Sequence, residues 1–271
     1  MYPLNEGKEA TLFQEAGVFT SMHEIAERSW DQVWLCISTP ALEGEWLPQL
    51  LENIGDATLV SLQPGIHTRD WLAQRYPAEK TVFGVITFIS WPAPLPGGEA
   101  IKPGIAYWLP PLSPNPFSGS SDAVSDIVRT LRAGGCPAKA HRDAAAWAAT
   151  PTAILMPHLC ALEMEGWSLR ALRKSPHLET AAAASREALS IVGSYQNKKP
   201  PWQRYWIRRG LMRIVLWFAP KLTPFDLETY LQVHFTKVGG QTRFLINGFI
   251  RSGAETNLPT DHLKRLSQTL P

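Results

Sequence analysis

Residues 31–65, DQVWLCISTPALEGEWLPQLLENIGDATLVSLQPG, carry the clearest fold signal in this chain. Residues 33–37 form a short apolar run, residues 42–51 repeat apolar side chains at helical spacing, and residues 58–62 form a second apolar run that a Pro-Gly pair closes. This order predicts strand, helix and strand. Two buried strands joined by one helix through short turns are most simply parallel, with a right-handed crossover. The stretch therefore predicts a βαβ unit of a doubly wound sheet.

Polar residues follow both predicted strands. Ser38 and Thr39 come directly after the first strand, and Gln63 comes directly after the second. Ligands of doubly wound sheets bind outside the carboxyl ends of the strands. We therefore predict that Ser38, Thr39 and Gln63 hold a cofactor through neutral hydrogen-bonding groups. The alternative is that they are ordinary turn residues, since none of them can take up a proton at neutral pH.

Four short motifs run through the chain in a fixed order. Residues 55–65 read G-x-x-T-x-V-x-L-Q-x-G and residues 82–88 read V-F-G-V-I-T-F, while N-G-F at 247–249 is followed by N-L-P-T at 257–260. In this order the sequence resembles the ketopantoate reductase family. The resemblance implies an NADPH-dependent dehydrogenase with an N-terminal Rossmann domain and a C-terminal helical domain. In that family the substrate and the nicotinamide meet in the cleft between the two halves.

Several positions depart from the family's pattern. The spacing G-x-G-x-x-G, which places a pyrophosphate on a helix N-terminus, does not occur in these 271 residues. The family's strand-end lysine falls on Ser38 and its asparagine falls on Pro64. Its general-acid lysine falls near Ala148, and its carboxylate before I-N-G falls near Thr242. Each replacement removes a charge or a hydrogen-bonding group that hydride transfer to a keto acid would use.

The first 30 residues read as a fragment of a domain. Residues 6–16 predict a helix and residues 22–28 another helical turn. In the resembled family a strand, a Gly-rich turn, a helix and a second strand precede this point. Either the start codon has been assigned too far downstream, or the protein dispenses with the phosphate-binding turn. We favour the first, because a parallel sheet without its central strand would expose apolar faces and unpaired edges.

The remaining pattern changes character near residue 143. Before it we predict a helix, a strand, an antiparallel edge strand, a loop and an amphipathic helix, at residues 68–76, 82–90, 105–109, 110–121 and 122–133. After it, helical spacing predominates, at residues 144–162, 168–175, 178–195, 204–219, 226–252 and 260–268. The predicted fold is therefore α/β plus all-α. A truncated Rossmann-like NAD(P)-binding domain (1–142) precedes a helical substrate or dimerisation domain (143–271).

A second candidate site lies in residues 230–242, YLQVHFTKVGGQT. The spacing of His234, Lys237 and Gln241 places them on one face of a helix, with Thr242 beside them. We predict that Lys237 is the catalytic residue, binding a substrate carboxylate or donating a proton if burial lowers its pKa. His234, Gln241 and Thr242 would then contact the substrate. The alternative is a solvated helical face, although two glycines in mid-helix suggest that another group approaches the backbone closely.

Cations and aromatic residues are concentrated in residues 198–213, KKPPWQRYWIRRGLMR. Such a mixture suits an anionic membrane surface or single-stranded nucleic acid. However, Trp206, Leu211, Val215 and Phe218 also form a stripe that would face the core of the second domain. We favour this last interpretation, with the arginines on the wet side of the helix.

Composition narrows the class of protein. The net charge is +2, 45% of the residues are apolar, and the three cysteines show no metal-ligand spacing. We therefore expect a cytoplasmic protein with a small-molecule substrate, without a metal, a nucleic-acid partner or a membrane, and with a homodimer as one alternative. Two functions remain open. One is an NAD(P)H-dependent oxidoreductase acting on a keto acid or related carbonyl compound, with NADP implied by the resemblance. The other is a non-catalytic member of the same fold that acts as a binding or partner scaffold.

Overall fold

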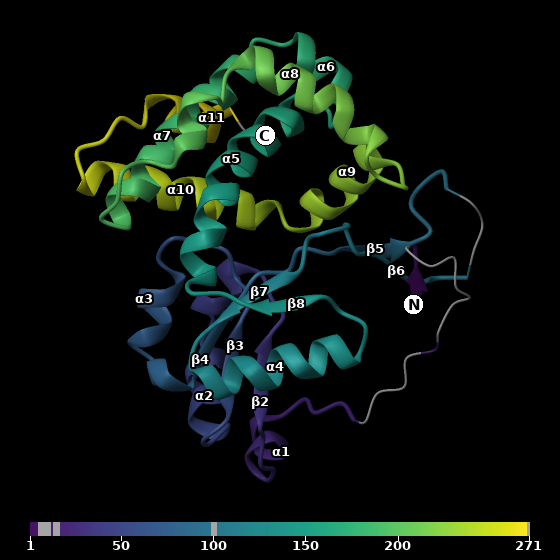
Figure 1. Cartoon of the computed structure of the whole chain (residues 1–271), viewed down its shortest axis with the longest axis vertical. Coiled ribbons are helices and arrows are strands. Elements are labelled where there is room, and N and C mark those ends of the chain that lie inside the picture. The colour runs from purple at the N-terminus through teal and green to yellow at the C-terminus, as the bar shows by residue number, and fades with distance from the viewer. Residues whose placement is uncertain (5–11, 13–16, 99–101, 270–271) are drawn as a thin grey trace. The chain divides into compact units, whose positions relative to one another are not determined.

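A computed structural model describes residues 1–4, 12, 17–98 and 102–269 (Figure 1). The chain divides into two compact units, Met1–Ala145 and Ala146–Pro271. All described strands belong to the first unit, and the described elements of the second unit are helices. The predicted succession of an α/β half and a helical half is confirmed. The helix predicted over 6–16 lies outside the described residues, except for residue 12.

The first unit contains a five-stranded sheet in the order β2-β3-β4-β7-β8. The three strands β2, β3 and β4 are parallel, β7 runs antiparallel to β4, and β8 is parallel to β7. Their bounds are Gln32–Leu35, Thr58–Ser61, Thr81–Gly84, Asn115–Ser118 and Ala138–Ala140. The helices of this unit are α1 (Met22–Ala26), α2 (Trp46–Asn53), α3 (Thr68–Ala73) and α4 (Ser121–Ala133), with 3-10 turns at Thr39–Glu43 and Ala78–Lys80. The βαβ unit predicted from residues 31–65 is thus present as β2, α2 and β3.

Residues 82–90, predicted as one strand, belong to two strands of different sheets. β4 ends at Gly84, and β5 (Ile89–Ala93) joins a separate three-stranded sheet in the order β1-β6-β5. The ring of Phe117 in β7 approaches Gly84 so closely that a Cβ there would lie 2.3 Å from it. After the end of β4, the Thr87 amide donates to Oδ1 of Asn115 at 2.7 Å.

Two further predictions in this region were wrong. The predicted loop 110–121 contains β7, whose four residues are all buried. The predicted edge strand at 105–109 is β6 (Gly104–Trp108), and it lies in the middle of its sheet between β5 and β1 (Tyr2–Pro3). Pairing with β4 and β8 overrides the Pro-rich local sequence of β7, and pairing of β6 with β1 covers the edge that was expected to be open.

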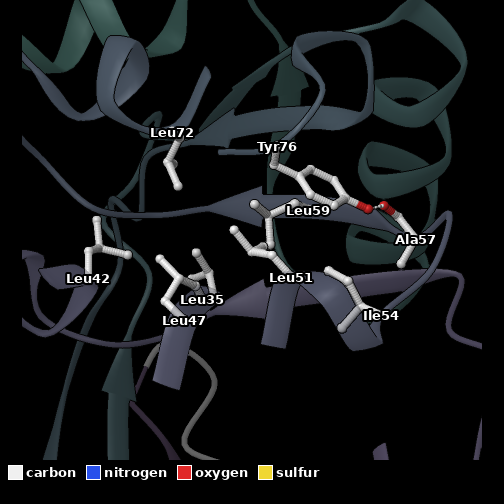
Figure 2. Packing of buried hydrophobic residues seen from close by; sticks show 9 residues of the cluster. All are labelled: Leu35, Leu42, Leu47, Leu51, Ile54, Ala57, Leu59, Leu72 and Tyr76. Carbon is white, nitrogen blue, oxygen red and sulfur yellow. Dashed lines mark hydrogen bonds between the residues drawn. The ribbon is translucent and has the colours of Figure 1, made fainter. Parts of the chain in front are cut away.

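The five-stranded sheet is covered on both faces. Successive side chains of a strand point to opposite faces, so Leu59 and Val60 of β3 enter different clusters, both fully buried. Leu59 packs among residues of α2 and α3, including Leu51 and Leu72 (Figure 2). Val60 packs with Phe117 and with residues of α4. Full burial of one such aliphatic side chain contributes about 1.5–3 kcal/mol, so both faces stabilise the sheet.

The second unit is built around α7. Its helices are α5 (Ala144–Met164), α6 (Leu169–Lys174), α7 (His177–Tyr195), α8 (Arg209–Phe218), α9 (Leu227–Lys237), α10 (Gly239–Glu255) and α11 (Asp261–Thr269), with 3-10 turns at Trp202–Tyr205 and Ala219–Lys221. Many alanines make α7 narrow, and most of its residues are buried. The buried carboxylate of Glu187 accepts the amides of His262 and Leu263 at 3.1 and 3.0 Å. It therefore caps the start of α11 and fixes α11 to α7.

Candidate functional site

The strand-end residues predicted as a cofactor site are close together in the structure. The hydroxyl of Thr39, after β2, donates to the backbone oxygen of Pro64, after β3, at 2.8 Å. Parallel strands place their carboxyl ends at the same edge of a sheet, which is why residues 25 positions apart meet here. The turn after β3 also depends on Gly65, whose φ of 145° is unfavourable for other residues.

Gln63 is the centre of this edge. Its Nε2 donates to the backbone oxygens of Leu35 and Ile37 at 2.5 and 3.0 Å, and its Oε1 accepts from the hydroxyl of Ser61 at 2.8 Å. Both amide hydrogens and the amide oxygen therefore bind the protein itself. Only 7% of the Gln63 surface and 3% of the Thr39 surface are exposed. These two side chains connect the ends of β2 and β3.

The same contacts limit how this edge would hold a nicotinamide cofactor. Among the described residues the half-buried hydroxyl of Ser38 makes no hydrogen bond, unlike the side chains of Thr39 and Gln63. A cofactor would therefore be bound by Ser38 and by the backbone of the two turns. That Thr39 and Gln63 bind a cofactor stays a prediction. The structure shows that both side chains hold the two turns together.

The second predicted site lies where α9 ends. Lys237 is the last residue of α9 and is exposed, whereas His234 is half-buried. The His234 ring stacks on Tyr230, with centroids 5.4 Å apart and planes inclined by 28°. Burial lowers the pKa of His234, and the neighbouring Lys237 charge lowers it further. His234 is therefore held towards its neutral form, in which it can donate or accept a hydrogen bond.

The single helix predicted over 226–252 is two helices. The chain leaves the helical path at Val238, with φ −110° and ψ 23°, so Gln241 and Thr242 belong to α10 rather than α9. The helical face predicted to carry His234, Lys237 and Gln241 is therefore interrupted. Gln241 is half-buried, and Thr242 is buried with 3% of its surface exposed. Glycine, which disfavours a helix interior, allows the break at this place.

The group that approaches the glycine backbone is Arg243. Its guanidinium lies 3.0 Å from where a Cβ on Gly239 would be, and it donates to the Gly239 oxygen at 3.3 Å. The same guanidinium forms an ion pair with Glu163 of α5 at 3.1 Å. Burial, together with the Glu163 charge, raises the pKa of the nearby Cys160 thiol to about 12, so this thiol is unreactive. Sequence reasoning missed Arg243, because its partner is 80 residues away.

A further hollow that the sequence did not predict lies within the first unit. A cavity of about 350 Å³ is lined by residues of α3, of the start of β4, and of the segments after β7 and β8. Arg69 of α3 forms a double hydrogen bond with Asp143 at its rim, one branch of which measures 3.0 Å. Arg69 also lies over the Phe83 ring, 5.5 Å from its centroid. The cavity wall therefore contains a cation and an anion that neutralise each other, Arg69 and Asp143.

A larger and more basic hollow lies in the second unit, between α6 and α8. Its volume is about 450 Å³. It is lined by Arg170, Arg173, Lys174, Gly210, Arg213, Ile214 and Trp217. The stripe of Trp206, Leu211, Val215 and Phe218, predicted to face the core, is 39–64% exposed, so that interpretation was wrong. On α8 it is Met212 that is buried.

The described residues contain no metal-ligand cluster and one helix that is apolar enough for a membrane span. Within the part of the chain that the structure describes, no three His, Cys, Asp or Glu side chains come together as a metal site would require. One described helix, α5, is long and apolar enough to cross a membrane. Buried residues make up 61% of its most apolar window, as in the core helix of a globular unit. This helix is therefore weak evidence for a span.

Comparison with known proteins shows a likeness in structure. No protein-family model matches the chain, and no curated protein sequence matches it. A 2-dehydropantoate 2-reductase from Geobacter metallireducens GS-15 superposes with a TM-score of 0.72 at 13% identity, over 99% of this chain and 84% of that one. A putative ketopantoate reductase from Ralstonia solanacearum gives 0.66 at 15% identity, over 99% and 83%. D-mandelate dehydrogenase, in a ternary structure with NADH and anilino(oxo)acetate, gives 0.65 at 12% identity, over 90% and 75%. The resemblance predicted from the sequence is thus confirmed at the level of structure, and the chain has the fold of the ketopantoate reductases.

Proposed function

We propose that this protein is a nicotinamide-dependent oxidoreductase that acts on a keto acid or a related carbonyl compound. The observation that carries the proposal is the fold, because a doubly wound sheet followed by a helical unit matches 2-dehydropantoate 2-reductases over nearly the whole chain. A second neighbour, D-mandelate dehydrogenase, was solved with NADH and an oxoacetate compound. Both kinds of neighbour support a carbonyl substrate that bears a carboxylate.

In this proposal the two predicted sites have separate tasks. The cofactor, which supplies a hydride, is held at the carboxyl ends of β2 and β3 by Ser38 and the turn backbone, while Thr39 and Gln63 keep the two turns in place. Lys237 binds the carboxylate of the substrate, since its side chain is exposed and the burial that proton donation was expected to need is absent. Because Lys237 is exposed, its flexible ammonium group can reach a bound acid. His234, Gln241 and Thr242 contact the remainder of the substrate. NADPH is preferred over NADH on the strength of the family resemblance.

The alternative is a non-catalytic scaffold with the same fold, and specific observations favour it. Ser38, Pro64, Ala148 and Thr242 stand where the resembled family has charged or amide groups, and none of the four titrates near neutral pH. Ala148 and Thr242 are, in addition, buried. In a scaffold the hydrogen bonds of Gln63 would serve stability alone. The two functions differ in whether the chain binds a dinucleotide.

Dinucleotide binding comes first in the experimental test. Titration of the full chain with NADPH and with NADH, followed by calorimetry, should give saturable binding. Oxidation of the bound cofactor is then followed spectroscopically with short, branched and aromatic 2-oxo acids. If neither dinucleotide binds, the oxidoreductase proposal is wrong and the scaffold remains.

Variants then test the role of Lys237. Lys237→Ala should lower kcat/KM by about 100-fold or more, as expected for loss of the partner of the substrate carboxylate. Lys264→Ala is the matched control, because Lys264 is an exposed lysine on α11 outside the proposed site. Turnover that is unchanged in Lys237→Ala would remove Lys237 from the site.

A further inference from the structure

The basic hollow between α6 and α8 has the composition of an anion site. Four of the side chains that line it are cations, three from α6 (Arg170, Arg173 and Lys174) and one from α8 (Arg213). None of the described residues that line it is acidic. Like charges gathered around one hollow repel each other, and a bound anion relieves this repulsion. A volume of about 450 Å³ falls within the range of small-molecule sites.

Some hydrogen-bond donors of the arginines in this region have no acceptor among the described residues. The buried Nε atoms of Arg173 and of the adjacent Arg209 lack hydrogen-bond partners among the described residues. The Arg209 guanidinium makes one long contact, of 3.4 Å, to the Lys174 backbone oxygen. Buried polar atoms normally have partners, so the arginines beside this hollow carry donors that the described residues leave unmatched. Phosphate oxygens suit arginine donors well, because the planar guanidinium can bind two of them at once.

The start of α8 adds further donors. Gly210 lies in the first turn of α8 and lines the hollow, and the N-cap residue Arg208 makes no side-chain capping bond. The first amides of a helix have no partner inside the helix, and the helix dipole makes this end positive. Backbone amides can therefore complete an anion site that the four cations begin.

Apolar side chains form the rest of the wall. Ile214 and Trp217 line the hollow and are 55% and 46% exposed. Such a wall favours a phosphate that is attached to an organic, apolar group over a bare inorganic ion. The surrounding segment 198–225 contains Lys198, Lys199, Arg204, Arg208, Arg209, Arg213 and Lys221 but no Asp or Glu. Its charge thus attracts anions from a distance.

We propose that the α6–α8 hollow binds the phosphate group of a phosphorylated organic ligand. Arg170, Arg173, Lys174 and Arg213 hold the phosphate, and Ile214 and Trp217 contact the apolar part. The inference does not depend on the oxidoreductase proposal, because none of these residues belongs to the sites around Gln63 or Lys237. The same chemistry is offered by a soluble phosphate ester and by the headgroup of an anionic lipid.

Binding experiments on the full chain test the proposal and separate the two sources. The soluble probes are pyrophosphate and phenyl phosphate, measured by calorimetry. The lipid probe is a phosphatidylcholine vesicle with and without phosphatidylglycerol, measured by cosedimentation. Saturable binding of phenyl phosphate that is tighter than that of pyrophosphate identifies a soluble ester as the ligand, whereas equal binding of the two probes would contradict a contact of Ile214 and Trp217 with the apolar part. Binding that requires phosphatidylglycerol, with no binding of the soluble probes, identifies a lipid headgroup.

Matched variants connect the binding to this hollow. Arg173→Ala and Arg213→Ala should each weaken binding by about tenfold or more, since each removes a charge-assisted contact to the anion. Arg265→Ala, which removes an exposed arginine on α11, should leave binding unchanged. Trp217→Ala should weaken phenyl phosphate more than pyrophosphate. Thermal melting by circular dichroism checks that each variant is folded. The proposal is overturned if no probe binds, or if Arg173→Ala and Arg213→Ala bind as Arg265→Ala does.

Discussion

Polar side chains are concentrated both at the strand-end turns of the first unit and in the α6–α8 hollow of the second unit. The two regions differ in whether these side chains have hydrogen-bond partners within the protein. At the turns, both donors and the acceptor of Gln63 and the hydroxyl of Thr39 bind the protein itself. The hollow is lined by four cationic residues, and the Nε of Arg173 has no partner among the described residues. A polar side chain that binds its own protein contributes to stability. One without a partner holds hydrogen-bonding capacity that the protein itself does not use.

The two regions also differ in the kind of observation that points to a ligand. The carboxyl ends of parallel strands are the usual place for a ligand, so Thr39 and Gln63 were predicted from topology to bind one. Their low exposure and their hydrogen bonds to the protein itself show a structural role for both, and their role in binding a cofactor stays a prediction. The α6–α8 hollow has no such precedent in the topology. The proposal of an anion site in this hollow rests on the charge of its lining residues and on their unmatched donors, and substitution of these residues tests both.

The largest expected effect is that of Gln63→Leu. The variant removes two donors and one acceptor from a buried position, leaving the Leu35 oxygen, the Ile37 oxygen and the Ser61 hydroxyl without this partner. Leaving buried polar groups unsatisfied costs about 1–3 kcal/mol each, and local relaxation recovers part of this cost. We expect the free energy of unfolding to fall by about 3 kcal/mol, as measured by urea denaturation.

The control for this variant is Gln49→Leu, because Gln49 is an exposed glutamine on α2. It should change the free energy of unfolding by less than about 0.5 kcal/mol. Equal effects of the two substitutions would mean that the bonds of Gln63 contribute nothing. The strand-end turns would then have no structural role that distinguishes them from the α6–α8 hollow.

A smaller loss is expected for Thr39→Val. Valine has nearly the shape of threonine, so the variant removes chiefly the hydrogen bond to the Pro64 oxygen. We expect a loss of about 1–2 kcal/mol in the free energy of unfolding, and faster hydrogen exchange in the turn after β3. Thr58→Val, at a half-buried strand position in β3, should show neither effect. Unchanged exchange in Thr39→Val would show that the two strand ends are held by other contacts.

Local patterns were enough to predict most elements of this fold. The βαβ unit, the covering helices and the change to helices near residue 143 all follow from hydrophobic periodicity and from turn residues. β7 was missed because Asn115 and Pro116 are poor strand residues, and only pairing with β4 and β8 makes them a strand. The residue that approaches Gly84 at the end of β4 is Phe117, which is 33 positions later in the chain.

The candidate sites were less predictable than the fold. The predicted topology correctly placed Thr39 and Gln63 at one edge of the sheet. Their donor groups, however, bind backbone oxygens, and a sequence pattern does not reveal such partners. The ion pairs Arg69–Asp143 and Arg243–Glu163 join residues 74 and 80 positions apart. Periodicity showed that α8 has an apolar side, but it cannot show whether another element covers that side. The exposure of Phe218 could be found only from the structure.

A buried histidine provides an intermediate case between the turns and the hollow. His158 on α5 is 6% exposed; its Nδ1 contacts the Ile154 oxygen at 2.7 Å, and its Nε2 is buried without a partner among the described residues. Burial lowers the pKa of His158 below its ordinary value of about 6.5. Between the two pKa values the unfolded chain binds more protons than the folded one, so acidification favours unfolding.

Stability should therefore fall as the pH drops from above 6.5 towards the folded-state pKa of His158. One proton sets a limit of about 1.4 kcal/mol per pH unit, and we expect a fraction of this slope. His158→Asn keeps a donor for the Ile154 oxygen but does not titrate, so its unfolding free energy should depend less on pH. Urea denaturation between about pH 7.5 and pH 5 measures both slopes. Identical slopes in the two proteins would exclude His158 as the cause.

The smallest expected effect belongs to Arg173→Ala. In contrast to Gln63, Arg173 has no acidic partner in the hollow and is surrounded by Arg170, Lys174 and Arg213. Its removal should leave the free energy of unfolding within about 0.5 kcal/mol of the wild type, and any gain should come from reduced repulsion.

Added salt screens that repulsion, so a gain seen at low ionic strength should vanish near 1 M sodium chloride. Addition of pyrophosphate should raise the melting temperature of the wild type but not that of the variant, because a ligand stabilises the folded form that binds it. A loss of several kcal/mol in Arg173→Ala would instead mean that Arg173 is a structural residue like Gln63, and the distinction between the two regions would be lost.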